Sequence, residues 1–195
     1  MCPHKITVKN KRTGQYMQVP CGNCLPCRAA RARSLAFVCN LKLYECYKLG
    51  FGSSFVTLTY SDDHLPFNDD FTHPTLLKSD LQKFFKNIRR QFAYHSVKGF
   101  DPEFYYLACG EYGDNSNRPH YHICMIGVPA PIMYKYGAKC WNYQNHGIID
   151  VGSLRTGGVS YVTKYCFKSL TGKKAKDLYD AVGVERPFIV HSKGF

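Results

Sequence analysis

Two strand-like runs joined by a turn-rich segment constrain the fold of this chain more than any other feature. The first run is "EFYYLACGEYG" (103–113), the second is "YHICMIG" (121–127), and "DNSNRP" (114–119) lies between them. Asp, Asn, Ser and Pro are residues that turns favour, so we predict an antiparallel β-hairpin. Such a hairpin needs further strands or helices to cover its apolar side chains.

Two histidines at the head of the second run suggest a metal site. Successive side chains of a strand alternate faces, so His120 and His122 point the same way with Cα atoms roughly 6.6 Å apart. Glu111 ends the first run and returns close to both if the hairpin closes. Two imidazoles and one carboxylate form an open ligand set that suits catalysis. The alternative is a pair of ordinary polar residues without an ion.

The remaining elements follow from apolar periodicity. We predict a helix from Arg28 to about Leu49, a strand over "SSFVTLTY" (53–60), and a helix capped by Ser79 that runs to about Ser96. Residues 128–156 suggest an irregular loop with a short strand at "GIIDVG". This order predicts an α+β sandwich, a small antiparallel sheet with flanking helices mostly on one face.

A last helix, "GGVSYVTKYCFKSL" (157–170) and stopped at Gly172, carries two tyrosines and two lysines at matched spacing. Tyr161 and Tyr165 are four residues apart, and Lys164 and Lys168 repeat that interval, so the hydroxyls lie one turn apart with ammonium groups beside them. A nearby lysine favours the phenolate, the nucleophilic form of tyrosine. The alternative is amphipathic packing with lysines reaching solvent.

The net charge indicates a polyanionic partner. The 195 residues include 26 Lys and Arg against 14 Asp and Glu, a formal charge of +12. Fifteen Tyr and thirteen Phe add stacking surface of the kind that single-stranded nucleic acid uses. The chain has neither a membrane span nor a signal peptide by its apolar pattern, so we expect no membrane association and a cytosolic protein.

Three of the ten cysteines cluster in "CGNCLPC" (21–27). Cys21, Cys24 and Cys27 offer three thiolates for a structural Zn²⁺, and the fourth ligand is Cys2, His4 or Cys39, of which we favour Cys2. We therefore predict a Cys-rich zinc-binding arm over residues 1–27 and one catalytic domain over residues 28–195.

Four stretches together resemble a known family. "FVTLTY", "GEYGDNSNRPHYHICMIG" and "GGVSYVTKYCFK", in that order, and the N-terminal "VPCGNCLPCR" resemble the HUH endonuclease superfamily, specifically the rolling-circle replication initiators of microvirus-type, gokushovirus-like single-stranded DNA phages. The resemblance implies that His120, His122 and Glu111 hold the metal and that Tyr161 and Tyr165 are nucleophiles with Lys164 and Lys168 beside them. It also implies an HUH-type fold, related to the ferredoxin-like sandwich.

The implied activity is site-specific nicking of single-stranded DNA at a phage origin. A tyrosine, assisted by Mg²⁺ or Mn²⁺, forms a 5′-phosphotyrosine and a free 3′-hydroxyl, and the ends are later rejoined. Expected partners are the origin DNA and the host helicase and polymerase, in the bacterial cytoplasm. Family members usually continue further, so we expect a domain truncated at its C-terminus. The side chains expected to contact DNA are Arg28, Arg31, Arg33, Thr57, Thr59 and Arg118.

Two other classes of function remain open from the sequence. One is a non-enzymatic, zinc-dependent nucleic-acid-binding module, in which charge and aromatic side chains account for everything and the tyrosines only pack. The other is a relaxase or transposase of the same superfamily, with the same chemistry on a different target.

Overall fold

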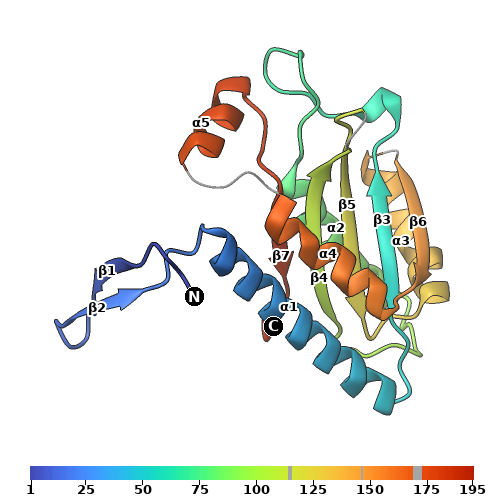
Figure 1. The fold of residues 1–195 in the computed structure, drawn as a ribbon. Coiled ribbons are helices and arrows are strands. Elements are labelled where there is room, and N and C mark those ends of the chain that lie inside the picture. Colours follow the sequence, from blue (N-terminus) through green and yellow to red (C-terminus); the bar gives the residue numbers. More distant parts are fainter. Residues whose placement is uncertain (114–115, 146, 169–172) are drawn as a thin grey trace.

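The computed structural model describes residues 1–113, 116–145, 147–168 and 173–195; within them, the side chains of residues 142–145, 156, 165–168 and 173–175 lie outside the description. The chain forms two strands, a helix, a strand, a short 3₁₀ turn and a helix, then two strands, and then alternating helices and strands (Figure 1). The elements are β1 (Ile6–Lys9), β2 (Tyr16–Val19), α1 (Leu25–Lys48), β3 (Ser54–Thr59), η1 (Asp62–His64), α2 (Lys78–Tyr94), β4 (Tyr105–Tyr112), β5 (Pro119–Ile126), α3 (Ala130–Asn145), β6 (Ile148–Ser153), α4 (Thr156–Lys168), α5 (Lys173–Val182) and β7 (Phe188–His191).

The centre of the fold is a five-stranded antiparallel sheet with strand order β6-β3-β5-β4-β7. The predicted hairpin is confirmed: β4 and β5 pair from Tyr105 opposite Ile126 to Tyr112 opposite Pro119. The strand β5 is the middle one, because β3 pairs with its other side. The α+β class is likewise confirmed.

Helices cover both faces of the sheet, which differs from the expectation of one covered face. One core joins α2 and α3 to the sheet, and a second core joins α1 and α4 to the opposite side (Figure 1). The reason lies in the middle strands. Six consecutive residues of β5, from Tyr121 to Ile126, are buried, a pattern typical of a strand covered on both sides rather than of one with a solvated face.

The helix α3 occupies a segment that we expected to be irregular. Met133, Cys140 and Trp141 are buried at the helical spacing of one face and belong to the α2-side core. Pro131 stands in the first turn, where a missing N–H costs nothing, so the proline that suggested a loop begins a helix instead. The short strand expected around residues 147–152 is confirmed as β6.

The start of α2 is held by a buried hydroxyl network instead of a serine cap. Ser79 lies inside the helix, and the N-cap is Leu77, so the expected Ser79 cap is wrong. The Leu77 N–H donates to the Tyr121 hydroxyl over 3.0 Å, and that hydroxyl donates to the Leu77 carbonyl. Tyr60 completes the network 2.8 Å from Tyr121 and 3.1 Å from the Asp80 carboxylate. Burial raises the pKa of Tyr60 well above its usual range.

Residues 1–20, which carry no helical pattern, form a two-stranded ribbon in which β1 and β2 pair only with each other among the described strands. This ribbon projects away from the sheet beyond the start of α1 (Figure 1). None of the helices among the described residues combines the length and apolar character that crossing a bilayer requires.

Candidate active site

Three metal-ligating side chains meet on neighbouring strands of the sheet. Glu111 of β4 lies directly opposite His120 in the hairpin register, and His122 follows on the same face of β5. The Glu111 Oε1 atom is 3.0 Å from His120 Nε2 and 3.1 Å from His122 Nε2. One ligand atom from each residue lies within 4.8 Å of the others. Ligands about 2.1 Å from an octahedral ion and at right angles stand roughly 3.0 Å apart, so the observed separations suit one small divalent cation.

The hydrogen bond at the far side of the His120 ring supports the same interpretation. His120 Nδ1 lies 3.0 Å from the Arg118 carbonyl oxygen, which can only accept, so Nδ1 carries the proton. In the neutral ring Nε2 then presents a lone pair to the Glu111 carboxylate, and two acceptors face each other at 3.0 Å. A cation between them, or a second proton on the ring, removes this conflict. The donor set therefore fits a metal ion.

His122 is oriented by a residue of the neighbouring strand β3. Thr57 is its register partner, and Thr57 Oγ1 lies 3.1 Å from His122 Nδ1. His122 and Glu111 are 7% and 5% exposed, so an unpaired polar atom here loses its solvation without compensation. We had expected Thr57 to contact DNA. The strand alternation placed it on the correct face, but only the register shows that its hydroxyl meets the imidazole.

Tyr161 of α4 lies against this group from the helix side. Its hydroxyl is 3.4 Å from His122 Nε2, and the two rings meet edge to face at 4.8 Å. Phe55 of β3 supports both rings, stacked on His122 at 5.7 Å and edge-on to Tyr161 at 6.0 Å. The Lys164 ammonium lies 3.7 Å from the centre of the Tyr161 ring. The sequence analysis missed Phe55, although it lies on the same strand face as Thr57.

A glycine allows α4 to approach the sheet closely enough for these contacts. A Cβ added to Gly158 would stand 2.8 Å from Leu154 Cδ1 and 3.0 Å from Phe55 Cδ2, closer than packing tolerates. Tyr165 and Lys168 belong to the same helix, but their side chains lie outside the described part of the chain. Their positions relative to the triad therefore stay predictions, and Gly172 lies outside the described residues.

The residues expected to contact DNA occupy different environments. Arg118 binds the chain after β3: its Nη1 is 2.6 Å from Asp62, and its Nη2 donates to the Tyr60 carbonyl. Thr59 is the register partner of His120 at the mouth of the site. Arg31 and Arg33 are exposed near the start of α1, and Arg28 is partly buried there. Their contact with DNA stays a prediction.

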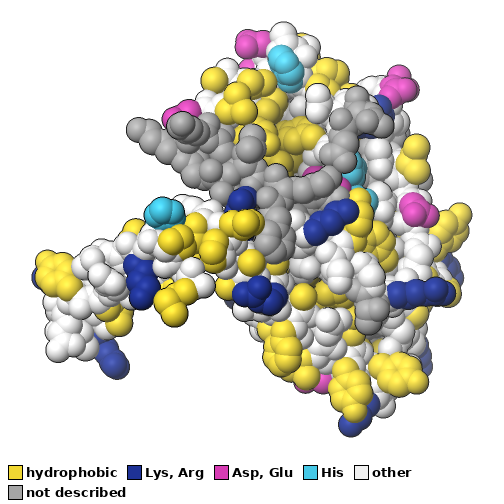
Figure 2. All heavy atoms as spheres, in the orientation of Figure 1, with side chains coloured by type: hydrophobic (Ala, Val, Ile, Leu, Met, Phe, Trp, Pro, Cys, Tyr) yellow, Lys and Arg dark blue, Asp and Glu magenta, His cyan; other side chains and the backbone are white. Residues whose placement is uncertain are grey.

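The face that carries α1 and α4 has the character of a nucleic-acid surface. Figure 2 shows Lys and Arg side chains spread over this face, from the ribbon to the edge of the sheet, with apolar side chains between them. The outward side of α1 contributes Phe37 and Tyr44, which are 70% and 56% exposed. Aromatic and basic side chains in alternation suit stacked bases and phosphates of a single strand.

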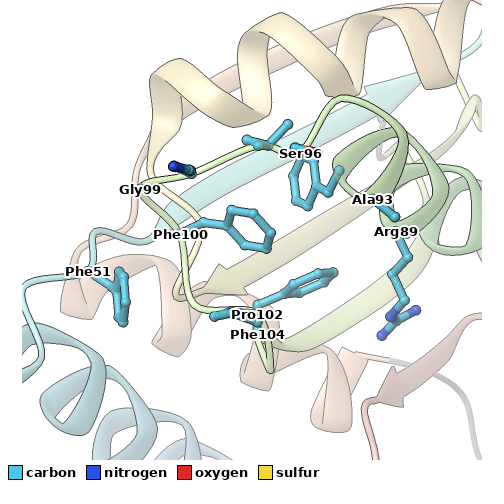
Figure 3. A pocket seen from close by; sticks show the side chains of 11 residues that line it. Phe51, Arg89, Ala93, Ser96, Gly99, Phe100, Pro102 and Phe104 are labelled. Atoms are coloured by element: carbon cyan, nitrogen blue, oxygen red, sulfur yellow. The ribbon is translucent and has the colours of Figure 1, made fainter.

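A separate aromatic pocket lies between the end of α2 and the segment before β4 (Figure 3). Phe92, Phe100 and Phe104 pack together in its wall, and the Arg89 guanidinium lies 5.1 Å from the centre of the Phe104 ring. These residues belong to the α2 side of the sheet, whereas the Glu111 carboxylate faces α4. The pocket and the candidate site are thus on different sides of the molecule.

Comparison with known proteins identifies the family. The family model for phage replication-associated proteins of the ORF2 type matches residues 53–170, a span that includes the triad and α4. The chain is 31% identical over 82% of its length to the replication-associated protein ORF2 of Spiroplasma virus 4, and 28% identical over 81% to the replication-associated protein VP4 of Bdellovibrio phage phiMH2K. It covers 51% and 50% of those proteins, about half their length.

A third relative is the replication-associated protein ORF4 of Chlamydia phage 1, at 26% identity over 77% of this chain and 38% of that protein. No solved structure matches the chain. The family match covers more than half of the residues and includes the hairpin, the triad and α4. The chain therefore belongs to the family of phage replication-associated proteins of the ORF2 type.

Proposed function

We propose that this chain is an HUH-type endonuclease that initiates rolling-circle replication by nicking single-stranded DNA at a phage origin. The observation that carries the proposal is the 3.4 Å separation between the Tyr161 hydroxyl and His122 Nε2, inside a group of metal-ligating side chains. A nucleophile and a phosphate-binding site must adjoin for phosphoryl transfer, because the reaction depends on positioning and on neutralising charge.

In the proposed reaction the Tyr161 oxygen attacks the scissile phosphorus in line. A bond from the phenol oxygen to phosphorus forms as the bond from phosphorus to the 3′ oxygen breaks. The phenol proton is lost, and the departing 3′ oxygen takes up a proton. The products are a 5′-phosphotyrosine and a free 3′-hydroxyl, and no bond energy is lost to hydrolysis. The reverse step rejoins the ends.

Each residue around the phenol has a distinct task in this proposal. Glu111, His120 and His122 would hold Mg²⁺ or Mn²⁺, which when bound supplies positive charge for the phosphate oxygens. Lys164, with its ammonium 3.7 Å from the Tyr161 ring, favours the phenolate. Phe55 fixes the ring against His122, which keeps the hydroxyl at the site before DNA arrives.

Tyr165 supplies the second nucleophile, with Lys168 beside it, so one tyrosine keeps the old 5′ end while the other cuts newly made origin DNA. Transfer between the two releases a closed circle. The partners of the whole protein are then origin single-stranded DNA and the host helicase and polymerase. Residues 28–195 form the nuclease domain, and residues 1–27 form an arm beside it.

The test is a covalent adduct assay. The protein is incubated with a labelled single-stranded origin oligonucleotide and Mn²⁺, and denaturing electrophoresis reveals protein linked to DNA. We expect an adduct with the wild type, none with the Tyr161→Phe, Tyr165→Phe double variant, and loss of metal-dependent cleavage with His120→Ala. Oligonucleotide affinity should stay within about a few-fold, since binding is distributed over many basic and aromatic residues.

Tyr134→Phe is the matched control, because Tyr134 is a 66% exposed tyrosine on α3, on the other side of the sheet. Cleavage that persists in the double tyrosine variant contradicts the mechanism. A wild type that binds the oligonucleotide without forming any adduct identifies the non-enzymatic binding module. An adduct that forms only on hairpin DNA identifies the relaxase or transposase alternative.

A further inference from the structure

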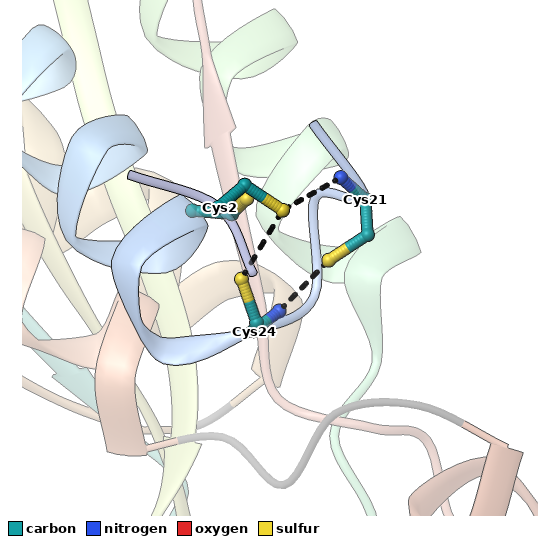
Figure 4. Close-up of side chains that lie close together, drawn as sticks. Cys2, Cys21 and Cys24 are labelled. Carbon is teal, nitrogen blue, oxygen red and sulfur yellow. Dashed lines mark hydrogen bonds between the residues drawn. The ribbon is translucent and has the colours of Figure 1, made fainter. Parts of the chain in front are cut away.

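Four cysteines converge at the junction between the ribbon and α1, far along the chain from the triad. Cys2 precedes the ribbon, Cys21 follows it, Cys24 is the N-cap of α1, and Cys27 lies in the first turn of that helix. One sulfur from each lies within 4.8 Å of the other three. Figure 4 shows Cys2, Cys21 and Cys24 pointing toward a common centre.

The sulfur geometry corresponds to a tetrahedral ion rather than to a disulfide. Cys2 Sγ and Cys24 Sγ are 3.6 Å apart, whereas a disulfide requires about 2.05 Å. Zn²⁺ bonds to sulfur at about 2.3 Å, so two thiolates of a tetrahedral site stand roughly 3.8 Å apart. The four thiols therefore need only a small adjustment to surround one ion.

Backbone amides already point at these sulfurs. The Cys21 N–H donates to Cys2 Sγ and the Cys24 N–H donates to Cys21 Sγ, each over 3.4 Å. Such bonds stabilise negative charge on sulfur, and orienting donors of this kind are what a metal site needs around its ligands. The loop between Cys21 and Cys24 turns through Gly22, whose φ of 79° favours glycine.

Two described parts of the fold have little other stabilisation at this place. The helix α1, all of it described, begins without a side-chain hydrogen bond to its N-cap and without an acidic residue in its first turn, although helix N-termini favour negative charge. The ribbon has four residues in each strand, and a two-stranded sheet of that size is marginal alone. A tetrathiolate ion supplies both missing elements: two negative charges at the helix start, and a coordinate link between both ends of the ribbon.

We propose that Cys2, Cys21, Cys24 and Cys27 bind one Zn²⁺ that serves as the N-terminal cap of α1 and as the anchor of the β1–β2 ribbon. Of the alternative fourth ligands, Cys39 is fully buried in the core under α4, and His4 is exposed and outside the four-sulfur group. This ion is separate from the cation at Glu111, His120 and His122. It is structural, so its ligands leave no position open for substrate.

The first experiment measures zinc per chain in the full-length protein purified with a reductant from zinc-supplemented cells. We expect one equivalent in the wild type and in the His120→Ala, His122→Ala double variant, and less than a tenth of an equivalent in Cys24→Ser. Cys140→Ala is the matched control, because it removes one buried thiol elsewhere and should keep the zinc. Zinc that follows the histidines instead of Cys24 overturns the proposal.

A second measurement covers the case in which Cys24→Ser fails to fold. Zinc is removed from the wild-type chain with a chelator and replaced by Co²⁺, and the absorption spectrum is recorded. Thiolate-to-cobalt charge transfer with the intense visible bands of a tetrahedral ion is the expected signature. A pale octahedral spectrum, or a metal-free chain that takes up neither ion, overturns the proposal, as does a Cys2–Cys24 disulfide found under reducing conditions.

The capping role has its own readout, which is hydrogen exchange of backbone amides. Chelation of the wild type should raise the exchange of the ribbon and of the first turn of α1 at least tenfold, and leave β4 and β5 unchanged because the sheet core holds them. Equal exchange with and without zinc would show that the ion neither caps the helix nor anchors the ribbon.

Discussion

The hydrogen bond from His122 to Thr57 provides the sharpest test of the site. If His122 binds the cation through Nε2, its Nδ1 carries the proton and donates to Thr57 Oγ1 over 3.1 Å. Valine has nearly the shape of threonine but cannot accept this bond. The Thr57→Val variant therefore leaves a donor unpaired next to a ring that is 7% exposed.

An unpaired buried donor costs about 1–3 kcal/mol, and removing an outer partner of a ligating histidine typically lowers metal affinity by about 10- to 100-fold. The two ranges agree, because about 1.4 kcal/mol corresponds to a factor of ten. We expect the Mn²⁺ concentration that gives half-maximal adduct formation to rise about 10- to 100-fold in Thr57→Val. Saturating Mn²⁺ should restore most of the rate.

Adduct formation is followed against Mn²⁺ concentration, and oligonucleotide binding is measured separately without metal. Thr57→Ser keeps the hydroxyl and should behave within about threefold of the wild type, well below the effect of losing an outer partner. An unchanged Mn²⁺ requirement in Thr57→Val, with weaker metal-free DNA binding, would refute this reasoning. It would also restore Thr57 as a DNA contact, which the sequence suggested.

Two further substitutions test the packing around the site. Gly158→Ala pushes α4 away from Phe55 and should lower the rate of adduct formation by about tenfold or more, since small misplacements of reacting groups are costly; Gly157→Ala, whose added Cβ meets no described atom within 4 Å, is the control, and equal rates would contradict the packing argument. Tyr60→Phe removes a hydroxyl 3.1 Å from buried Asp80 and should cost about 1–3 kcal/mol, or roughly 2–10 °C in the melting temperature. Because the pKa of Tyr60 is raised in the folded state, its contribution is present below the unfolded pKa of about 10 and is lost as pH rises above it, so the wild type should melt at lower temperature in alkali; a wild type and a Tyr60→Phe variant with identical melting profiles up to about pH 11 would contradict this.

Local patterns predicted the hairpin and the ligand group, and long-range contacts decided the rest. Period-two alternation in β5 put His120 and His122 on one face, and the turn brought Glu111 opposite His120. The fit between Phe55 and Tyr161 depends on how α4 lies on the sheet, and a side-chain pattern does not contain that information. The same holds for the hydroxyl network at the start of α2.

The misassigned segments share a physical cause. In α3, Pro131 and the glycine at position 137 suggested a loop, but the burial of Trp141 outweighs their weak helix propensity. The added Cβ of Gly137 would stand 2.9 Å from Met133 and 3.0 Å from Ile149, so a glycine here brings the helix close to β6. The ribbon was missed because its strands are short and mostly exposed, which leaves little periodicity.

The central position of β5 has a consequence for any exchange of DNA ends. This strand is hydrogen-bonded on both sides, to β3 and β4, so His120 and His122 sit on a backbone that has no freedom to shift without breaking the sheet. The helix α4 touches the same place through side chains such as Tyr161, which meets Phe55. The ligands are thus stationary, and a handover from one tyrosine to the other must come from rolling or sliding of the helix, or from travel of the strand of DNA itself.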